Sequence, residues 1–174
     1  VLAGEGQERR LRLLRVDLEG ARPLRGFILG WGAYEAATRM AAEEGRGRGG
    51  AQVARTILAL LRRATVGREA AAIRRGISGG LRAERALAGV ATTLEGPLIL
   101  GLEPFWGEGD GPIRWTEAAA PGRPLTLGLA CALAGRPMNW MERVGYRSGR
   151  SEALTLRVPA LVLDGERVEA HGPV

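Results

Sequence analysis

The stretch LVLDGERVEA, residues 161–170, offers the clearest candidate for acid–base chemistry in the chain. Apolar and charged residues alternate on both sides of an Asp-Gly pair, and both residues of that pair tolerate positive φ, so the pattern predicts a tight β-hairpin. On the pattern alone Glu166 is a solvated residue that leaves the turn. A carboxylate fixed beside a substrate hydroxyl could instead accept its proton. The residues leave both interpretations open.

A second acidic segment, PFWGEGDGPIRWTE at 104–117, places Glu108 and Asp110 on either side of a glycine. Carboxylate oxygens suit a hard cation such as Mg²⁺, so this loop is a candidate metal site. The alternative is an acidic surface turn flanked by Trp106 and Trp115 as core aromatics. Composition alone favours the surface turn, because a magnesium site normally has more oxygen ligands than two side chains supply.

GFILGWGAYEAA contains a G-x-x-x-G-x-G spacing at Gly26, Gly30 and Gly32. Glycines ahead of a helix can let the backbone approach a phosphate, so Gly30 and Gly32 are candidate nucleotide-binding residues. The pattern differs from the dinucleotide fingerprint and has no P-loop lysine.

Composition narrows the function classes. The net charge is +6 and every basic side chain is arginine, a composition that favours phosphates, nucleic acid or anionic lipid and that coding bias could equally produce. The single cysteine, Cys131, excludes an intrachain disulfide and indicates a reducing, cytoplasmic location. With His171 as the only histidine, a zinc site or a Cys-His catalytic pair has almost no ligands from which to form.

The elements expected to position these residues are mostly strands. Residues 10–19 predict a strand with Leu11, Leu13, Val16 and Leu18 facing inward and an irregularity at Leu14. A strand should then pass into a helix after Gly32. Further strands are expected within 69–100, at 111–120 and within 151–170, where Pro159 indicates an edge or a bulge.

Two segments predict helices. Residues 51–63 form an amphipathic pattern with cations in the last turn, and 124–135 reads as a largely buried helix. The length suits one domain, 1–174. The predicted fold class is therefore α+β and mostly β: a two-sheet β-sandwich with about two packed helices.

In this order, the segments RLRLLRVDLEGARPLRGFILGWGAYEAATR, AQVARTILALLRR, GEGDGPIRW and SEALTLRVPALVLDGERVEA resemble the C-terminal half of bacterial diacylglycerol kinase-like lipid kinases, a family that includes sphingosine and ceramide kinases. In that family an N-terminal α/β domain carries a Gly-Gly-Asp-Gly nucleotide site, and a C-terminal β-sandwich completes the cleft. This chain has no Gly-Gly-Asp-Gly. The resemblance implies a C-terminal domain without the nucleotide-binding domain, inactive when isolated.

The resemblance also implies residue roles. Glu166 would be the general base that accepts the proton of a lipid hydroxyl, and Asp164 would shape the turn or support Glu166. Asp110, with Glu108, would contribute to a magnesium site, although Pro112 and Ile113 stand where the family usually has leucines. The cofactors of the complete enzyme would be Mg²⁺ and ATP.

The expected partners are a lipid substrate, a transient contact with the membrane surface and the N-terminal kinase domain of the same polypeptide. Nucleic acid is not expected, a homodimer is left open, and the location is cytoplasmic and peripheral to the membrane. Two other classes compete. One is a basic non-catalytic module that binds nucleic acid or anionic membrane, with steep salt dependence. The other is a structural domain that mediates oligomer contacts through an exposed strand edge.

Overall fold

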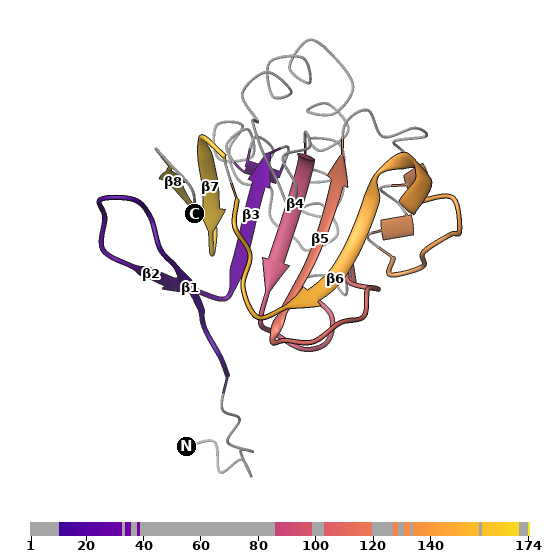
Figure 1. Cartoon of the computed structure of the whole chain (residues 1–174), viewed down its shortest axis with the longest axis horizontal. Coiled ribbons are helices and arrows are strands. Elements are labelled where there is room, and N and C mark those ends of the chain that lie inside the picture. The colour runs from indigo at the N-terminus through magenta and orange to yellow at the C-terminus, as the bar shows by residue number, and fades with distance from the viewer. Residues whose placement is uncertain are drawn as a thin grey trace, which may run out of the picture.

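The computed structural model describes residues 11–32, 34–35, 38, 86–98, 103–119, 127–128, 131–132, 134–156, 158–170 and 174. Across these residues the protein is mostly β, with two sheets and very few helical residues (Figure 1), as the sequence predicted. A small sheet pairs β1 (Leu14–Val16) with β2 (Leu24–Gly26).

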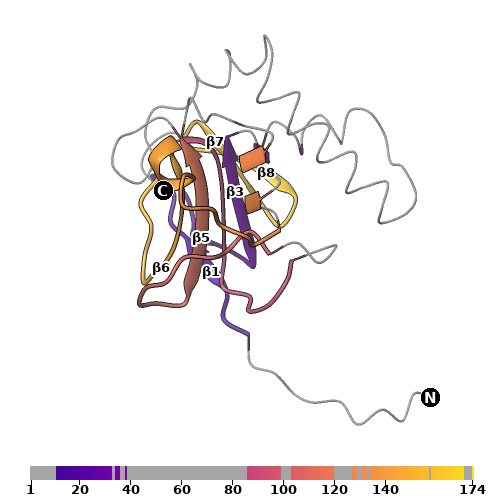
Figure 2. The ribbon, with the colours of Figure 1, turned by 90° about the vertical axis from the view of Figure 1, so that its right-hand side faces the viewer.

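The larger sheet has six antiparallel strands in the order β6-β5-β4-β3-β7-β8, and Figure 2 shows it from the β6 side. Its strands are β3 (Ile28–Gly32), β4 (Ala86–Thr92), β5 (Ile113–Ala119), β6 (Tyr146–Ser151), β7 (Ala160–Leu163) and β8 (Glu166–Glu169). The expected strands at 28–32, 113–119 and 160–169 are confirmed. β7 and β8 form the predicted hairpin.

The main core lies on one face of this sheet. Leu29 and Trp31 of β3 point into it, and the Trp31 ring covers Gly89 so closely that a Cβ there would lie 2.0 Å from the indole. Because side chains alternate along a strand, Gly30 and Gly32 face the opposite side. The cluster joins both sheets and comprises Leu14, Val16, Leu29, Trp31, Ala91, Leu156, Val158, Leu161 and Leu163.

The first strand is shorter than predicted, and some of its side chains face the opposite side from the one predicted. Leu14 and Val16 are buried, whereas Leu11 is 59% and Leu13 47% exposed. The prediction that Leu11 and Leu13 face inward was therefore wrong, and Leu14, treated as an irregularity, is a core residue. The run has leucines at both parities, so alternation alone could not choose the buried face.

Helical structure is limited in the part of the chain that is described. Tyr34, Glu35 and Thr38 are helical, which confirms the passage from strand to helix after Gly32. Within the expected helix at 124–135, residues 127–128 and 131–132 are helical, and a 3₁₀ turn follows at Glu142–Val144. The expected helix at 51–63 and any strands at 69–85 lie outside the described residues. Among those described, no helix is long and apolar enough to cross a membrane.

The polar strand β6 was not predicted, and the residues expected to form a strand after Ser151 leave the sheet. Residues 152–156 are in neither sheet. Leu156 nevertheless exchanges two backbone hydrogen bonds with Val174, at 2.7 and 2.9 Å. Pro159 directly precedes β7, and its carbonyl accepts a hydrogen bond from the Ala170 amide at 3.0 Å.

Candidate functional site

The β7–β8 turn has the geometry of a two-residue hairpin loop. Asp164 has φ 50° and Gly165 has φ 92°. Two consecutive residues of positive φ are the signature of a type I′ turn, whose twist matches that of the flanking strands. The register pairs Leu163 with Glu166 directly across the turn.

The Asp164 carboxylate points away from the turn toward the start of β3. It accepts hydrogen bonds from the Phe27 amide, at 3.0 Å to each oxygen, and from the Ile28 amide at 2.8 Å. The Asp164 amide in turn donates to the Ile28 carbonyl at 2.9 Å. Gly26 allows this approach, because a Cβ there would lie 2.7 Å from Asp164 Oδ2. Asp164 therefore anchors the hairpin to β3.

Glu166 differs from its neighbour in the turn. It is exposed, and its side chain makes no hydrogen bond or ion pair with any described residue. Directly paired residues of antiparallel strands project from the same face of a sheet, so Glu166 shares a face with Leu163 and, through the next pairing, with Leu29. Its backbone lies two strand spacings, about 10 Å, from that of Leu29.

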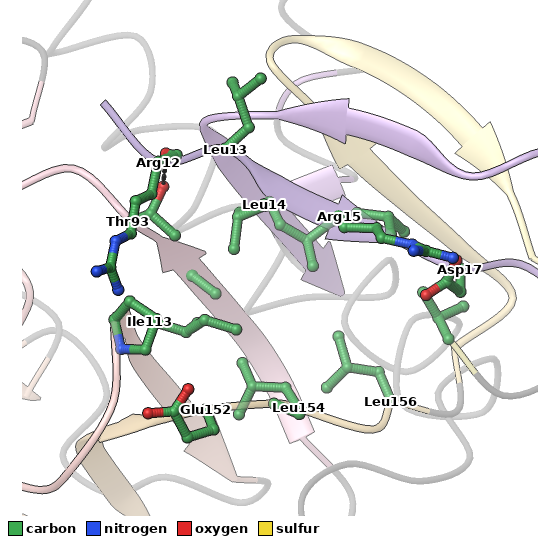
Figure 3. Close-up of a pocket in the computed structure, with 16 residues that line it drawn as sticks. Arg12, Leu13, Leu14, Arg15, Asp17, Thr93, Ile113, Glu152, Leu154 and Leu156 are labelled. Atoms are coloured by element: carbon green, nitrogen blue, oxygen red, sulfur yellow. Dashed lines mark hydrogen bonds and ion pairs between the residues drawn. The ribbon is translucent and has the colours of Figure 1, made fainter. Parts of the chain in front are cut away.

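A cavity of about 330 Å³ lies on this face, between β1, the six-stranded sheet and the segment 152–156 (Figure 3). Its aliphatic wall includes Leu14, Val16, Leu29, Ala91, Ile113, Leu154, Leu156 and Val174. The exposed polar residues Arg12, Arg15, Asp17 and Glu152 line it where it meets solvent. An apolar interior with a charged mouth suits an amphipathic ligand.

A helical turn covers the other face of the hairpin. The Tyr34 ring packs on Gly30, where a Cβ would lie 2.0 Å from it. Burial raises the pKa of Tyr34, and the negative charge of Asp164 raises it further. Arg167 of β8 donates to Glu35 at 2.7 Å and to Glu169 at 3.0 Å. The contact between Arg167 and Glu35 links residues far apart in sequence and had no signal in the local pattern.

Gly30 and Gly32, the candidate nucleotide-binding residues, are buried in β3. The Tyr34 ring occupies the space above Gly30 and gives a packing reason for that glycine. Gly32 has φ 66°, a conformation that glycine adopts without strain, at the point where the strand ends and the helix begins. Their assignment to a nucleotide stays a prediction.

The acidic loop at 107–111 lies against β6. A Cβ at Gly107 would lie 1.9 Å from the Ser148 carbonyl oxygen, one at Gly109 would lie 2.7 Å from that of Arg150, and one at Gly111 would lie 2.2 Å from the Ser151 carbonyl carbon. The alternating glycines thus seat the loop on the strand. Between them, Glu108 and Asp110 are exposed.

Two carboxylates supply fewer oxygens than a magnesium site normally has, and the assignment of Glu108 and Asp110 to a metal stays a prediction. Among the described residues, no group of three or more His, Cys, Asp or Glu side chains is placed to hold a metal ion. Mg²⁺ prefers six oxygens in octahedral geometry, and the loop offers two exposed side chains. We therefore assign no chemical step to a metal at Glu108 and Asp110.

Polar residues that the sequence analysis missed hold the same region together. Ser148 Oγ accepts hydrogen bonds from the Trp106 and Gly107 amides, each at 3.1 Å, and donates to the Trp115 carbonyl at 3.0 Å. The buried Arg114 donates to the carbonyls of Leu94 and Gly96. Its guanidinium carbon lies 4.7 Å from the centre of the Phe105 ring.

Glu95 connects this network to β6. Arg150 binds its carboxylate through both terminal nitrogens at 3.0 Å, and Arg114 lies 3.7 Å from it. The hydrogen bond from Arg150 lowers the pKa of Glu95, and the charges of Arg150 and Arg114 act in the same direction. Bidentate geometry is the strongest form of such a pair. Glu95 is therefore a structural carboxylate.

Cys131 and Tyr146, the other reactive residues described, lie at a second small core cluster. Cys131 is half-buried and, like Trp140, packs against the small cluster of Ala132, Met141 and Tyr146. Burial raises the pKa of Tyr146 to about 12, and the nearby Cys131 adds to the shift. His171 lies outside the described residues.

Comparisons with family models, with curated proteins and with solved structures gave no match to the chain.

Proposed function

We propose that this chain is the lipid-binding, base-supplying domain of an ATP-dependent lipid kinase, and that Glu166 is the general base. The observation that carries the proposal is the position of Glu166: an exposed carboxylate without a partner among the described residues, on an anchored turn, in the same cross-strand row as a wall residue of the apolar cavity. The resemblance to diacylglycerol kinase-like enzymes supports it independently.

In the proposed fold the β1–β2 sheet and the six-stranded sheet are the two layers of a sandwich. The shared core cluster of both sheets supports this arrangement. An acyl chain of the lipid would occupy the cavity between them. Its hydroxyl would reach past the cavity toward Glu166, across a distance of about two strand spacings.

In the proposed reaction Glu166 accepts the proton of the lipid hydroxyl. The hydroxyl oxygen forms a new bond to the γ-phosphorus of ATP, and the bond between that phosphorus and the β,γ-bridging oxygen breaks, so ADP leaves. Asp164 keeps the turn rigid and leaves the proton transfer to Glu166. ATP would be bound by an α/β domain of the kind found in the family, since this chain has no Gly-Gly-Asp-Gly.

The test is an ATP-dependent assay of the complete gene product with a short-chain diacylglycerol and a sphingoid base as substrates. Glu166→Gln should lower turnover by about a hundredfold to ten-thousandfold, the range for removal of a general base. Glu142→Gln, an exposed carboxylate on the 3₁₀ turn, is the matched control and should keep full turnover. Wild-type turnover by Glu166→Gln would remove the assignment.

A further inference from the structure

The outer face of the β1–β2 sheet carries two arginines directly opposite each other. Arg15 of β1 pairs in register with Arg25 of β2, and both are exposed. Leu14 and Val16, the neighbours of Arg15, are each only 4% exposed and point into the core. Alternation along the strand therefore turns Arg15 and its cross-strand partner outward.

This placement is unfavourable for the isolated sheet. Like charges directly opposite on neighbouring strands repel each other. Asp17 binds Arg15 at 2.9 Å, but that pair is well exposed and contributes little. Arg25 makes no ion pair with a described residue. An external anion placed between the two guanidinium groups would relieve the repulsion.

Two leucines continue the same outward row. Leu11 and Leu13 precede Arg15 at two-residue spacing and are the exposed apolar side chains of this segment. A surface that combines exposed leucines with arginines matches the boundary of an anionic bilayer, where apolar side chains enter the acyl region and guanidinium groups bind lipid phosphates. No aromatic side chain lies in the row, so it lacks the stacking platform of a single-strand nucleic-acid site.

The row also adjoins the mouth of the cavity. Arg12 and Leu13 belong to the same segment and both line the cavity (Figure 3). We propose that Leu11, Leu13, Arg15 and Arg25 form a docking surface for anionic lipid bilayers, which holds the mouth of the cavity against the membrane. The proposal rests on the proposed function only in taking a membrane lipid as the occupant of the cavity.

The test is co-sedimentation of the full chain with vesicles of equal parts phosphatidylglycerol and phosphatidylcholine, compared with pure phosphatidylcholine. Wild type should bind the anionic vesicles preferentially. Arg15→Gln/Arg25→Gln should weaken that binding on the order of tenfold. Arg15→Lys/Arg25→Lys should bind nearly as well as wild type, and Leu11→Ser/Leu13→Ser should weaken binding to both vesicle types.

The matched control is Arg136→Gln/Arg143→Gln, which removes two exposed arginines from the segment before β6. It should bind as wild type does. Equal weakening by this control would overturn the proposal, because binding would then follow net charge. Absence of a preference for anionic vesicles, or tighter binding to a single-stranded oligonucleotide that Arg15→Gln/Arg25→Gln also weakens, would overturn it as well.

The two proposals fail separately. Glu166→Gln should bind vesicles as wild type does, since Glu166 lies outside the docking surface. The wild-type chain could fail to bind vesicles and still turn over a soluble short-chain substrate in a Glu166-dependent way. That result would contradict the docking surface alone. Normal docking with turnover that is insensitive to Glu166→Gln would defeat the general-base assignment alone.

Discussion

Two acidic turns of this protein contain the same residue types in opposite order, Asp-Gly-Glu at 164–166 and Glu-Gly-Asp at 108–110, and the backbone gives them different properties. In the hairpin, Asp164 accepts backbone hydrogen bonds and Glu166 stays available. In the loop, both acidic side chains are exposed while the glycines face β6. Both turns lie against a strand, but the hairpin is held by the Asp164 carboxylate itself, whereas the loop is seated on β6 by its glycines, so only the hairpin gives its two carboxylates different roles.

The largest effect on stability is expected where a glycine has no room for a side chain. Gly107→Ala should lower the free energy of unfolding by about 2–3 kcal/mol, because its Cβ would lie 1.9 Å from the Ser148 carbonyl oxygen and the loop would have to leave β6. Urea denaturation followed by circular dichroism measures it. A loss below about 0.5 kcal/mol would show that the loop is not seated on the strand.

The anchor of the hairpin should rank next. Asp164→Ala removes the acceptor of the Phe27 and Ile28 amides and should cost about 2 kcal/mol of unfolding free energy, a typical value for hydrogen bonds to a charged group. Asp110→Ala is the matched control in the other turn and should stay within about 0.5 kcal/mol of wild type. Equal losses of unfolding free energy in the two variants would contradict the claim that Asp164 anchors its turn whereas Asp110 does not.

Gly165→Ala should have a smaller effect than Gly107→Ala for a different reason. No atom lies within 4 Å of a Cβ at Gly165, so the cost is the strain of φ 92° on a residue with a side chain, about 1 kcal/mol. The same denaturation experiment ranks the two glycines. A larger loss at Gly165 than at Gly107 would reverse our account of which turn is crowded.

Acid pH should produce the smallest effect, through Glu95. The pKa of Glu95 is lowered in the folded protein, chiefly by Arg150, so the ion pair stabilises the fold above the ordinary glutamate pKa, and this contribution disappears as pH falls through the lowered value. Because Glu95 is 66% exposed, the contribution is under about 1 kcal/mol. Glu95→Gln should reduce the difference in stability between neutral and acid pH, and an unchanged difference would contradict the pair's role.

Local patterns predicted local structure well. The Asp-Gly turn, the strand that passes into a helix after Gly32, and the strand at 113–119 each depend on signals within a few residues, and the structure has all three. The strand β6 was not predicted, because its sequence YRSGRS has little alternation of apolar and polar residues. Ser148 and Ser151 instead hold this strand through hydrogen bonds to the loop and to the Trp115 indole.

The contacts that define the candidate site were beyond local reasoning. Asp164 binds amides more than 130 residues away in sequence, and no spacing rule could assign that partner. Which leucines of the β1 segment face the core is decided by tertiary packing, because the sequence has leucines at both alternating positions. The hairpin's two carboxylates could be proposed from the sequence, but their separate positions required the tertiary pairing of β7 with β3.

The most direct test of the division of roles measures stability and turnover together in the complete gene product. We predict that Glu166→Gln leaves the free energy of unfolding within about 0.5 kcal/mol of wild type and lowers turnover by at least about a hundredfold. Asp164→Ala, measured in parallel, should lose about 2 kcal/mol of stability. Full turnover in Glu166→Gln, or a loss of stability as large as that of Asp164→Ala, would contradict the account.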